Sequence, residues 1–167
     1  MPRLTSIAVD TNVLFDLVRK LEVVIDCLET IAKRIPNSSI VVLPTVIIEL
    51  RKMTKSGDLK EQMIAEKALS NILNPWGFVP VNCIPVGHGI VAEIGRKIRA
   101  SGLIPDEEIH DSFIVAEAAL SGATMLVSSD GHIKDIDQKR LKIELDSCDV
   151  PCPLIASPWR IVNTFFI

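Results

Sequence analysis

The sequence contains no apolar run long enough to cross a membrane. Hydrophobic residues make up 48% of the chain, but charged residues interrupt every run before the roughly 20 residues that a membrane-spanning helix needs. The first residues also lack the long apolar stretch of a secretory signal peptide. We therefore expect a cytoplasmic protein without a membrane segment, and the length of 167 residues fits one domain over residues 1–167.

The chain also lacks the second cysteine and histidine pair that would complete a zinc site. Cys148 and Cys152 lie close together, but no further pair has matching spacing. Cys27 and Cys83 lie in apolar surroundings, where a cysteine is usually a buried free thiol. Reduced thiols are the favoured interpretation for all four.

A broad surplus of basic residues is missing as well. The net charge of −3 and the pI near 5.6 argue against nonspecific binding of long nucleic acid over a large surface. Short basic clusters lie beside Glu49, Asp111 and Asp130, although each cluster alone is typical of a solvated helix face. The charge is therefore compatible with an enzyme that acts on nucleic acid at a confined site.

What the sequence does contain is an alternation of short apolar segments and amphipathic ones. Strands are predicted at residues 4–9, 40–43, 78–81, 124–128 and 153–156, and helices at 11–18, 21–35, 45–54, 59–73, 87–100, 105–121 and from 158 onward. Thr45 and Asp106 are predicted helix caps, and Gly122 is predicted to end the sixth helix. This alternation indicates a three-layer α/β/α fold with a central, mainly parallel sheet of four to five strands.

Four acidic residues lie within or directly after separate apolar segments. Asp10 and Asp130 follow predicted strands, whereas Glu49 and Asp111 lie on predicted helices beside apolar positions. Open parallel sheets bind ligands at the carboxyl ends of their strands, so we expect these side chains to converge there. Clustered carboxylates in an apolar setting repel one another and are costly to desolvate. Such a cluster needs protons, basic partners or a bound cation, and we favour the cation.

Oxygen ligands of this type suit Mg²⁺ and Mn²⁺, which prefer octahedral coordination by carboxylates and water. These ions polarise phosphoryl oxygens, lower the pKa of bound water and neutralise charge on a leaving oxygen. The four acids therefore predict metal-dependent hydrolysis of phosphodiester bonds.

Each acid also has a simpler interpretation when it is taken alone. Asp10 could cap the helix that follows it, and Glu49 could pair with a basic neighbour on the surface. Asp111 could be tolerated at the rim of the core, and Asp130 could belong to a turn. Together these four interpretations leave the repeated placement at strand ends unexplained.

The order of these segments resembles that of the PIN-domain nucleases, which include the VapC-type toxins of toxin–antitoxin pairs. The resemblance rests on Val9-Asp10-Thr11-Asn12, Glu49, Asp-Ser-Phe-Ile-Val-Ala-Glu-Ala-Ala-Leu-Ser-Gly-Ala at 111–123 and Leu-Val-Ser-Ser-Asp at 126–130. It implies a PIN-like fold in which Asp10, Glu49, Asp111 and Asp130 hold Mg²⁺ or Mn²⁺ and activate water, while Asn12 and Ser128 orient the acids. It further implies a ribonuclease for single-stranded RNA, with a small antitoxin and a second copy of the chain as candidate partners.

The sequence departs from this family at two places. Residues 56–85 form a longer segment than the smallest toxins have, and His132-Ile133 replaces the usual aromatic residue after the last acid. We assign no catalytic role to His88, His110 or His132, and we expect His110 to point away from the side of the helix that carries Asp111.

Two other classes of protein remain as alternatives. A phosphatase with an aspartyl nucleophile also places an aspartate after its first strand, but Asn12 stands where its general acid would be. The non-enzymatic alternative is a catalytically silent PIN-like module that binds RNA or a protein. Covalent trapping at Asp10 would favour the phosphatase, and binding without cleavage would favour the module.

Overall fold

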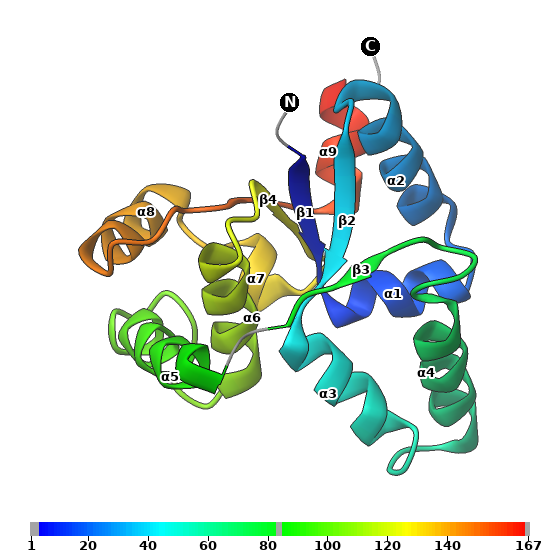
Figure 1. The fold of residues 1–167 in the computed structure, drawn as a ribbon, viewed down its shortest axis with the longest axis horizontal. Coiled ribbons are helices and arrows are strands. Elements are labelled where there is room, and N and C mark those ends of the chain that lie inside the picture. Colours follow the sequence, from blue (N-terminus) through cyan, green and yellow to red (C-terminus); the bar gives the residue numbers. More distant parts are fainter. Residues whose placement is uncertain (1–3, 83–84, 166–167) are drawn as a thin grey trace.

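Five parallel strands form one sheet in the order β3-β2-β1-β4-β5, in a computed structural model that describes residues 4–82 and 85–165 (Figure 1). The strands are β1 (Thr5–Val9), β2 (Ser38–Val42), β3 (Val79–Pro80), β4 (Met125–Val127) and β5 (Leu154–Ala156). Every neighbouring pair runs parallel. The predicted α/β class is confirmed, and the sheet has five strands, the larger of the two predicted numbers.

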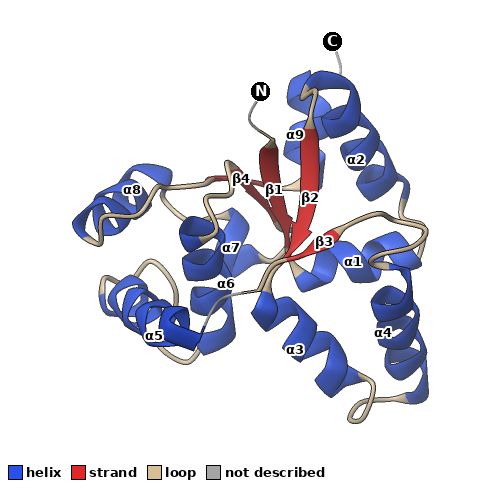
Figure 2. Cartoon of the chain, in the orientation of Figure 1, coloured by secondary structure: helices blue, strands red, loops and turns tan. Residues whose placement is uncertain are grey.

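Helices connect the strands and cover the sheet on both sides (Figures 1 and 2). They are α1 (Thr11–Val18), α2 (Glu22–Arg34), α3 (Pro44–Met53), α4 (Leu59–Asn71), α5 (Pro85–Ala100), α6 (Ile109–Leu120), α7 (Gly131–Lys134), α8 (Gln138–Ser147) and α9 (Pro158–Phe165). In Figure 1, α5 to α8 lie to the left of the central strands, and α1, α2 and α4 lie to their right. α9 is partly hidden by β2 in this view and packs against α2. None of the helices in the described ranges has both the length and the apolar character needed to cross a membrane.

The central strand β1 is buried along its carboxyl half, where Ile7, Ala8 and Val9 are fully buried. A short, continuously apolar strand is typical of a parallel sheet with helices on both faces. Val9 pairs in register with Val42 of β2 and with Val127 of β4. Residues that follow these three positions therefore emerge together at one edge of the sheet, beyond which α3 extends in Figure 1.

The predicted cap of α3 is wrong. The N-cap is Leu43, two residues before the predicted cap, and Pro44 lies in the first turn, a position that proline favours. Thr45 lies inside the helix, and its backbone N–H donates to the Glu117 carboxylate of α6. A contact from a distant element therefore replaces the local cap that the sequence pattern suggested.

The predicted cap of α6 is wrong too. Asp106 lies in a turn in which the Glu108 N–H donates to the Pro105 carbonyl, so the helix begins only at Ile109. Glu108 takes the N-cap position but makes no side-chain capping hydrogen bond. This later start places Asp111 in the first turn, where a negative charge interacts favourably with the helix dipole.

Two helices of the left-hand layer are absent from the sequence-based prediction. α7 buries only Ile133, and α8 buries only Leu141 and Leu145. Helices this short and polar show little apolar periodicity, which is the main signal for a helix in a sequence.

Of the cysteines, Cys27 is a buried free thiol, and its burial raises the pKa of that thiol to about 12. The expectations for Cys83 and for the side chain of His88 lie outside the described part of the structure.

Gly95 marks the close approach of α5 to α6. A Cβ atom at this position would lie 2.9 Å from Phe113 Cδ1 and 3.0 Å from Ser112 Oγ. We expect Gly95→Ala to lower the free energy of unfolding by about 1–2 kcal/mol, because overpacking outweighs the gain in helix propensity. Gly89→Ala, in the same helix with no atom within 4 Å of the added Cβ, should instead leave stability unchanged or raise it. Urea unfolding of both variants checks this, and equal stabilities would contradict it.

Candidate metal centre

Asp10 lies at the carboxyl end of β1 and is only 3% exposed. Its Oδ1 accepts a hydrogen bond of 2.7 Å from the Thr11 N–H, and the residue is the N-cap of α1. The capping interpretation of Asp10 is therefore correct as local structure. The cap uses only Oδ1, because Oδ2 faces Ser128 at the end of β4.

Ser128 connects two of the predicted acids. The pairing of Val9 with Val127 places the next residue of each strand side by side. The buried Ser128 hydroxyl donates to Asp10 Oδ2 at 2.6 Å, and its oxygen accepts from the Asp130 N–H at 3.1 Å. One side chain therefore orients Asp10 and fixes the backbone that carries Asp130.

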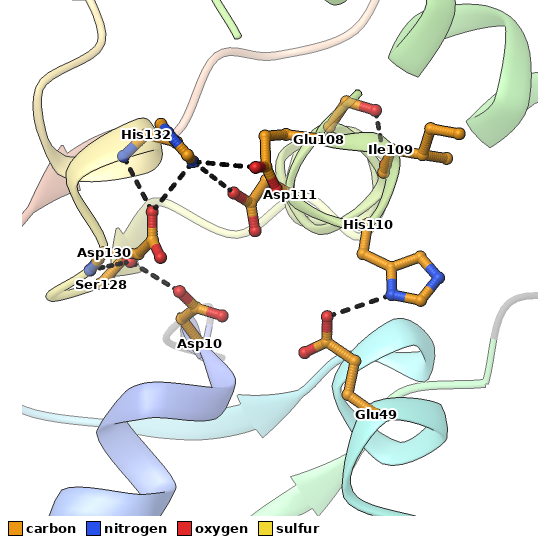
Figure 3. Close-up of polar contacts among 10 residues, drawn as sticks. Asp10, Glu49, Glu108, Ile109, His110, Asp111, Ser128, Asp130 and His132 are labelled. Atoms are coloured by element: carbon orange, nitrogen blue, oxygen red, sulfur yellow. Dashed lines mark hydrogen bonds and ion pairs between the residues drawn. The ribbon is translucent and has the colours of Figure 1, made fainter. Parts of the chain in front are cut away.

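Asp111 of α6 faces Asp130 across an imidazole ring (Figure 3). His132 Nδ1 lies 3.3 Å from Asp111 Oδ2 and 3.7 Å from oxygens of both Asp130 and Glu108. The His132 position itself is fixed by its backbone N–H, which donates to Asp130 Oδ1 at 2.8 Å. Ligand atoms of Glu108, Asp111 and His132 all lie within 4.8 Å of one another, a grouping that could hold a metal ion.

Glu49 approaches the same cavity from α3. Its Oε2 accepts a hydrogen bond from the Thr11 hydroxyl, and its Oε1 lies 3.3 Å from His110 Nδ1. The alternative of pairing with a basic neighbour on α3 is not what the structure shows. His110 leaves α6 in a different direction from Asp111, as expected, and its side chain is 45% exposed (Figure 3). It nevertheless lines the cavity, which the sequence did not indicate.

These side chains enclose one cavity of about 300 Å³. All four predicted acids line it, and they come from four different parts of the chain. The full lining is Asp10, Thr11, Asn12, Glu49, Lys52, Met53, His110, Asp111 and Asp130. Asn12 is exposed on this lining, and no hydrogen bond joins it to the four acids within the described residues. The four predicted acids thus line one cavity. Of the two predicted orienting residues, Ser128 contacts an acid, whereas Asn12 contacts none of the four within the described residues.

The ionised form of the buried acids is disfavoured. Burial raises the pKa of Asp10 from 3.8 to about 7 against the opposing hydrogen bonds from Ser128 and Thr11, and the charges of Glu49 and Asp111 add to the rise. Burial also raises the pKa of Asp111 to about 6, with the charges of Asp130 and Glu108 acting in the same direction and the His132 hydrogen bond opposing them. Near neutral pH the site therefore has too little positive charge to balance its carboxylates, which is the deficit that a bound cation would fill.

This deficit predicts how the metal-free protein responds to pH. A carboxyl whose pKa is raised by folding stabilises the fold below its unfolded value of 3.8, and this stabilisation is lost as the pH rises to about 7. At about 1.4 kcal/mol per pKa unit, the loss at Asp10 is a few kcal/mol. Asp10→Asn should therefore be more stable than the wild type at about pH 8 and not at about pH 4.5, measured by urea unfolding with a chelator. A difference that does not change with pH would contradict this.

The donor set fits a hard divalent cation. Carboxylate oxygens from four parts of the chain converge, and the basic side chains that contact them among the described residues are His110 and His132. Lys52 lines the cavity but forms no ion pair with these acids in the described part of the chain. Oxygen donors of this kind suit Mg²⁺ and Mn²⁺. Glu108 and His132 are additional candidate ligands that the sequence analysis did not assign. Their only sequence signal is adjacency, since Glu108 lies three residues before Asp111 and His132 two after Asp130.

No protein-family model and no curated protein matches the chain. Solved structures do match it in fold. The VapBC2 structure from Rickettsia felis, bound to a DNA fragment from their promoter, superposes with a TM-score of 0.61 at 18% identity and covers 92% of this chain and 98% of its own. The fold is therefore that of the VapC-type PIN domains, and the predicted resemblance is confirmed at the level of the fold.

Two structures of a second system have the same fold. FitAcB from Neisseria gonorrhoeae has a TM-score of 0.54 at 19% identity, covering 92% of this chain and 98% of its own. FitAB bound to an IR36 DNA fragment has a TM-score of 0.54 at 18% identity, covering 92% and 95%. The likeness extends over nearly the whole length of each chain.

Proposed function

We propose that residues 1–167 act as one PIN-like domain, a Mg²⁺- or Mn²⁺-dependent endoribonuclease that hydrolyses phosphodiester bonds of single-stranded RNA. The observation that carries the proposal is the convergence of Asp10, Glu49, Asp111 and Asp130 on one cavity at the carboxyl edge of the sheet. The PIN-type fold supports it, because four separate elements deliver these acids in the order that the sequence resemblance implies.

In this proposal the four carboxylates hold the ion, and Ser128 keeps Asp10 in place through its hydrogen bond. A bound ion would polarise the phosphoryl group of the substrate and lower the pKa of a coordinated water. Asp10 and Asp111, whose pKa values are raised in the metal-free site, would release their protons on binding the ion and hold it as carboxylates. Glu49 is held toward the cavity by Thr11 and lies across the site from Asp130 (Figure 3).

The substrate side of the cavity carries two groups that can contact phosphate. Lys52 lines the cavity one turn after Glu49 on α3. His110 of α6 also lines the cavity, and it lies beside Glu49. Their positions at the edge of the acidic centre suit the backbone phosphates of one flexible strand, which can bend into a small cavity. With a net charge of −3, binding outside this region should be weak, which favours cleavage at a confined site.

We also propose that this protein is the toxin of a toxin–antitoxin pair in the cytoplasm. The VapBC2 and FitAB structures, which share its fold, are bound to DNA, in the VapBC2 case to a fragment from their promoter. A small antitoxin protein is the partner we expect, with a homodimer as a second assembly. Co-expression with the product of a neighbouring small reading frame tests this, and a partner that copurifies and inhibits cleavage is the expected result.

The proposed activity is tested by incubating the protein with mixed single-stranded RNA in Mn²⁺, in Mg²⁺ and in a chelator. We expect endonucleolytic products with either metal, none with the chelator, and little cleavage of duplex RNA. Binding of RNA without cleavage in any metal would instead support the silent module. A covalent aspartyl-phosphate at Asp10 would support the phosphatase.

A further inference from the structure

Helix α3 begins without a cap of its own. Its N-cap residue is Leu43, which makes no side-chain capping hydrogen bond, and the next residue is Pro44, which has no N–H. The Thr45 N–H lies in the first turn, where no acceptor is available within the helix. A helix start of this kind requires an acceptor from elsewhere in the protein.

Glu117 of α6 supplies that acceptor. Its side chain is buried, at 2% exposure for the residue, and its Oε1 and Oε2 lie 2.9 and 3.1 Å from the Thr45 backbone nitrogen. A carboxylate at a helix N-terminus interacts favourably with the helix dipole. The surroundings are largely apolar, including Ile48 and Phe113, so this attraction is weakly screened.

The two helices joined by this contact are the two that carry acids of the metal centre. Glu49 lies one helical turn after Thr45 on α3, and Asp111 lies in the first turn of α6. Near the cavity, Glu49 is held to other elements only through Thr11 and His110 in the contacts described above. The Glu117 contact therefore fixes α3 against α6 at a point outside the cavity.

We propose that Glu117 is a positioning residue that sets the separation of the Glu49 and Asp111 carboxylates by anchoring the N-terminus of α3 to α6. Its consequence for catalysis rests on the proposed nuclease function. Glu117 does not line the cavity and touches none of its acids in the contacts described, so its effect is transmitted through helix placement. Displacements of about 1 Å at a catalytic group are enough to lower activity strongly.

Glu117→Ala should weaken Mn²⁺ binding about tenfold and lower kcat by about tenfold or more, with KM for RNA changed less than about twofold. Glu117→Gln keeps the side-chain volume and one acceptor oxygen but loses the charge. It should therefore retain most of the Mn²⁺ affinity that Glu117→Ala loses. Calorimetry at a temperature where all variants are folded measures the affinity.

Asp58→Ala is the matched control. Asp58 caps α4 by accepting a 2.8 Å hydrogen bond from the Glu61 N–H, and α4 carries none of the four acids. Both alanine variants should lower the Tm, but only Glu117→Ala should change Mn²⁺ affinity and kcat. A folded Glu117→Ala protein with wild-type affinity and kcat would overturn the proposal. If this variant does not fold, Glu117→Leu, which fills the space but offers no acceptor to the Thr45 N–H, decides by the same two measurements.

Crystal structures of metal-free Glu117→Gln and Glu117→Leu separate this proposal from the nuclease proposal. In Glu117→Gln, which keeps one acceptor for the Thr45 N–H, the distance between the Glu49 and Asp111 carboxylates should stay within about 0.3 Å of the wild type. In Glu117→Leu, which has no acceptor, it should increase by about 0.5–1 Å, and an unchanged distance in Glu117→Leu would overturn the positioning role. This measurement needs neither metal nor RNA. If the wild-type protein binds no Mn²⁺, the proposed nuclease function is refuted. The positioning role is then still decided by the distance between the Glu49 and Asp111 carboxylates.

Discussion

Asp10→Asn should reduce metal-dependent cleavage of single-stranded RNA by at least about 100-fold, a loss of about 2.7 kcal/mol in transition-state stabilisation. The substitution keeps the shape and an acceptor for Ser128, but it removes the charge from the most deeply buried acid of the centre. The effect should appear in kcat, because binding of RNA at the edge of the cavity does not depend on Asp10. Asp111→Asn should give a loss of similar size.

The control for this prediction is Asp146→Asn. Asp146 is an exposed acid of α8 that pairs with Lys142 at 2.7 Å and does not line the cavity. Its replacement should leave cleavage within about twofold of the wild type, since an exposed ion pair contributes little to stability. If purified Asp10→Asn cleaves RNA at the wild-type rate, the Asp10 carboxylate has no role in the mechanism.

Mn²⁺ should stabilise the wild-type protein and not the Asp10→Asn variant. At a concentration about 100 times Kd, binding to the folded state alone raises the free energy of unfolding by about 2.7 kcal/mol. For a chain of this size, that gain corresponds to about 5–10 °C in Tm. The ion replaces the protons that burial and the neighbouring carboxylates favour on Asp10 and Asp111.

The same gain should depend on pH. At about pH 5 a proton on Asp10 competes with the ion, because its pKa is raised to about 7, so the shift in Tm should be much smaller than at about pH 8. Thermal unfolding with Mn²⁺ and with a chelator at both pH values measures this. An equal shift in Asp10→Asn at pH 8 would mean that the ion binds elsewhere.

Much of the fold was predictable because its signals are local. The strands are short apolar runs, and Gly122, with a φ of +72°, ends α6 where the sequence indicates. The starts of α3 and α6 were not predictable in the same way. The first depends on Glu117, which is distant in sequence, and the second is delayed by a turn at Pro105.

The convergence of the four acids was predictable from a general rule, since strand ends of a parallel sheet meet at one edge. The neighbours of those acids were not. His110 lines the cavity because α6 packs against α3, and Glu108 lies in the N-cap position that the turn at Pro105 creates. Neither arrangement has a signal in the local sequence. His132 lies in a four-residue helix with little sequence signal, so its contact with Asp111 was visible only in the structure.

A crystal structure of the protein soaked in Mn²⁺, with anomalous diffraction to locate the ion, tests the account most directly. We expect an ion in the cavity with oxygens of Asp10 and at least one of Glu49, Asp111 and Asp130 at about 2.0–2.3 Å, the usual range for hard divalent cations. An ion bound only outside this cavity, or none at a concentration that supports cleavage, would contradict the proposal that these carboxylates form the metal centre.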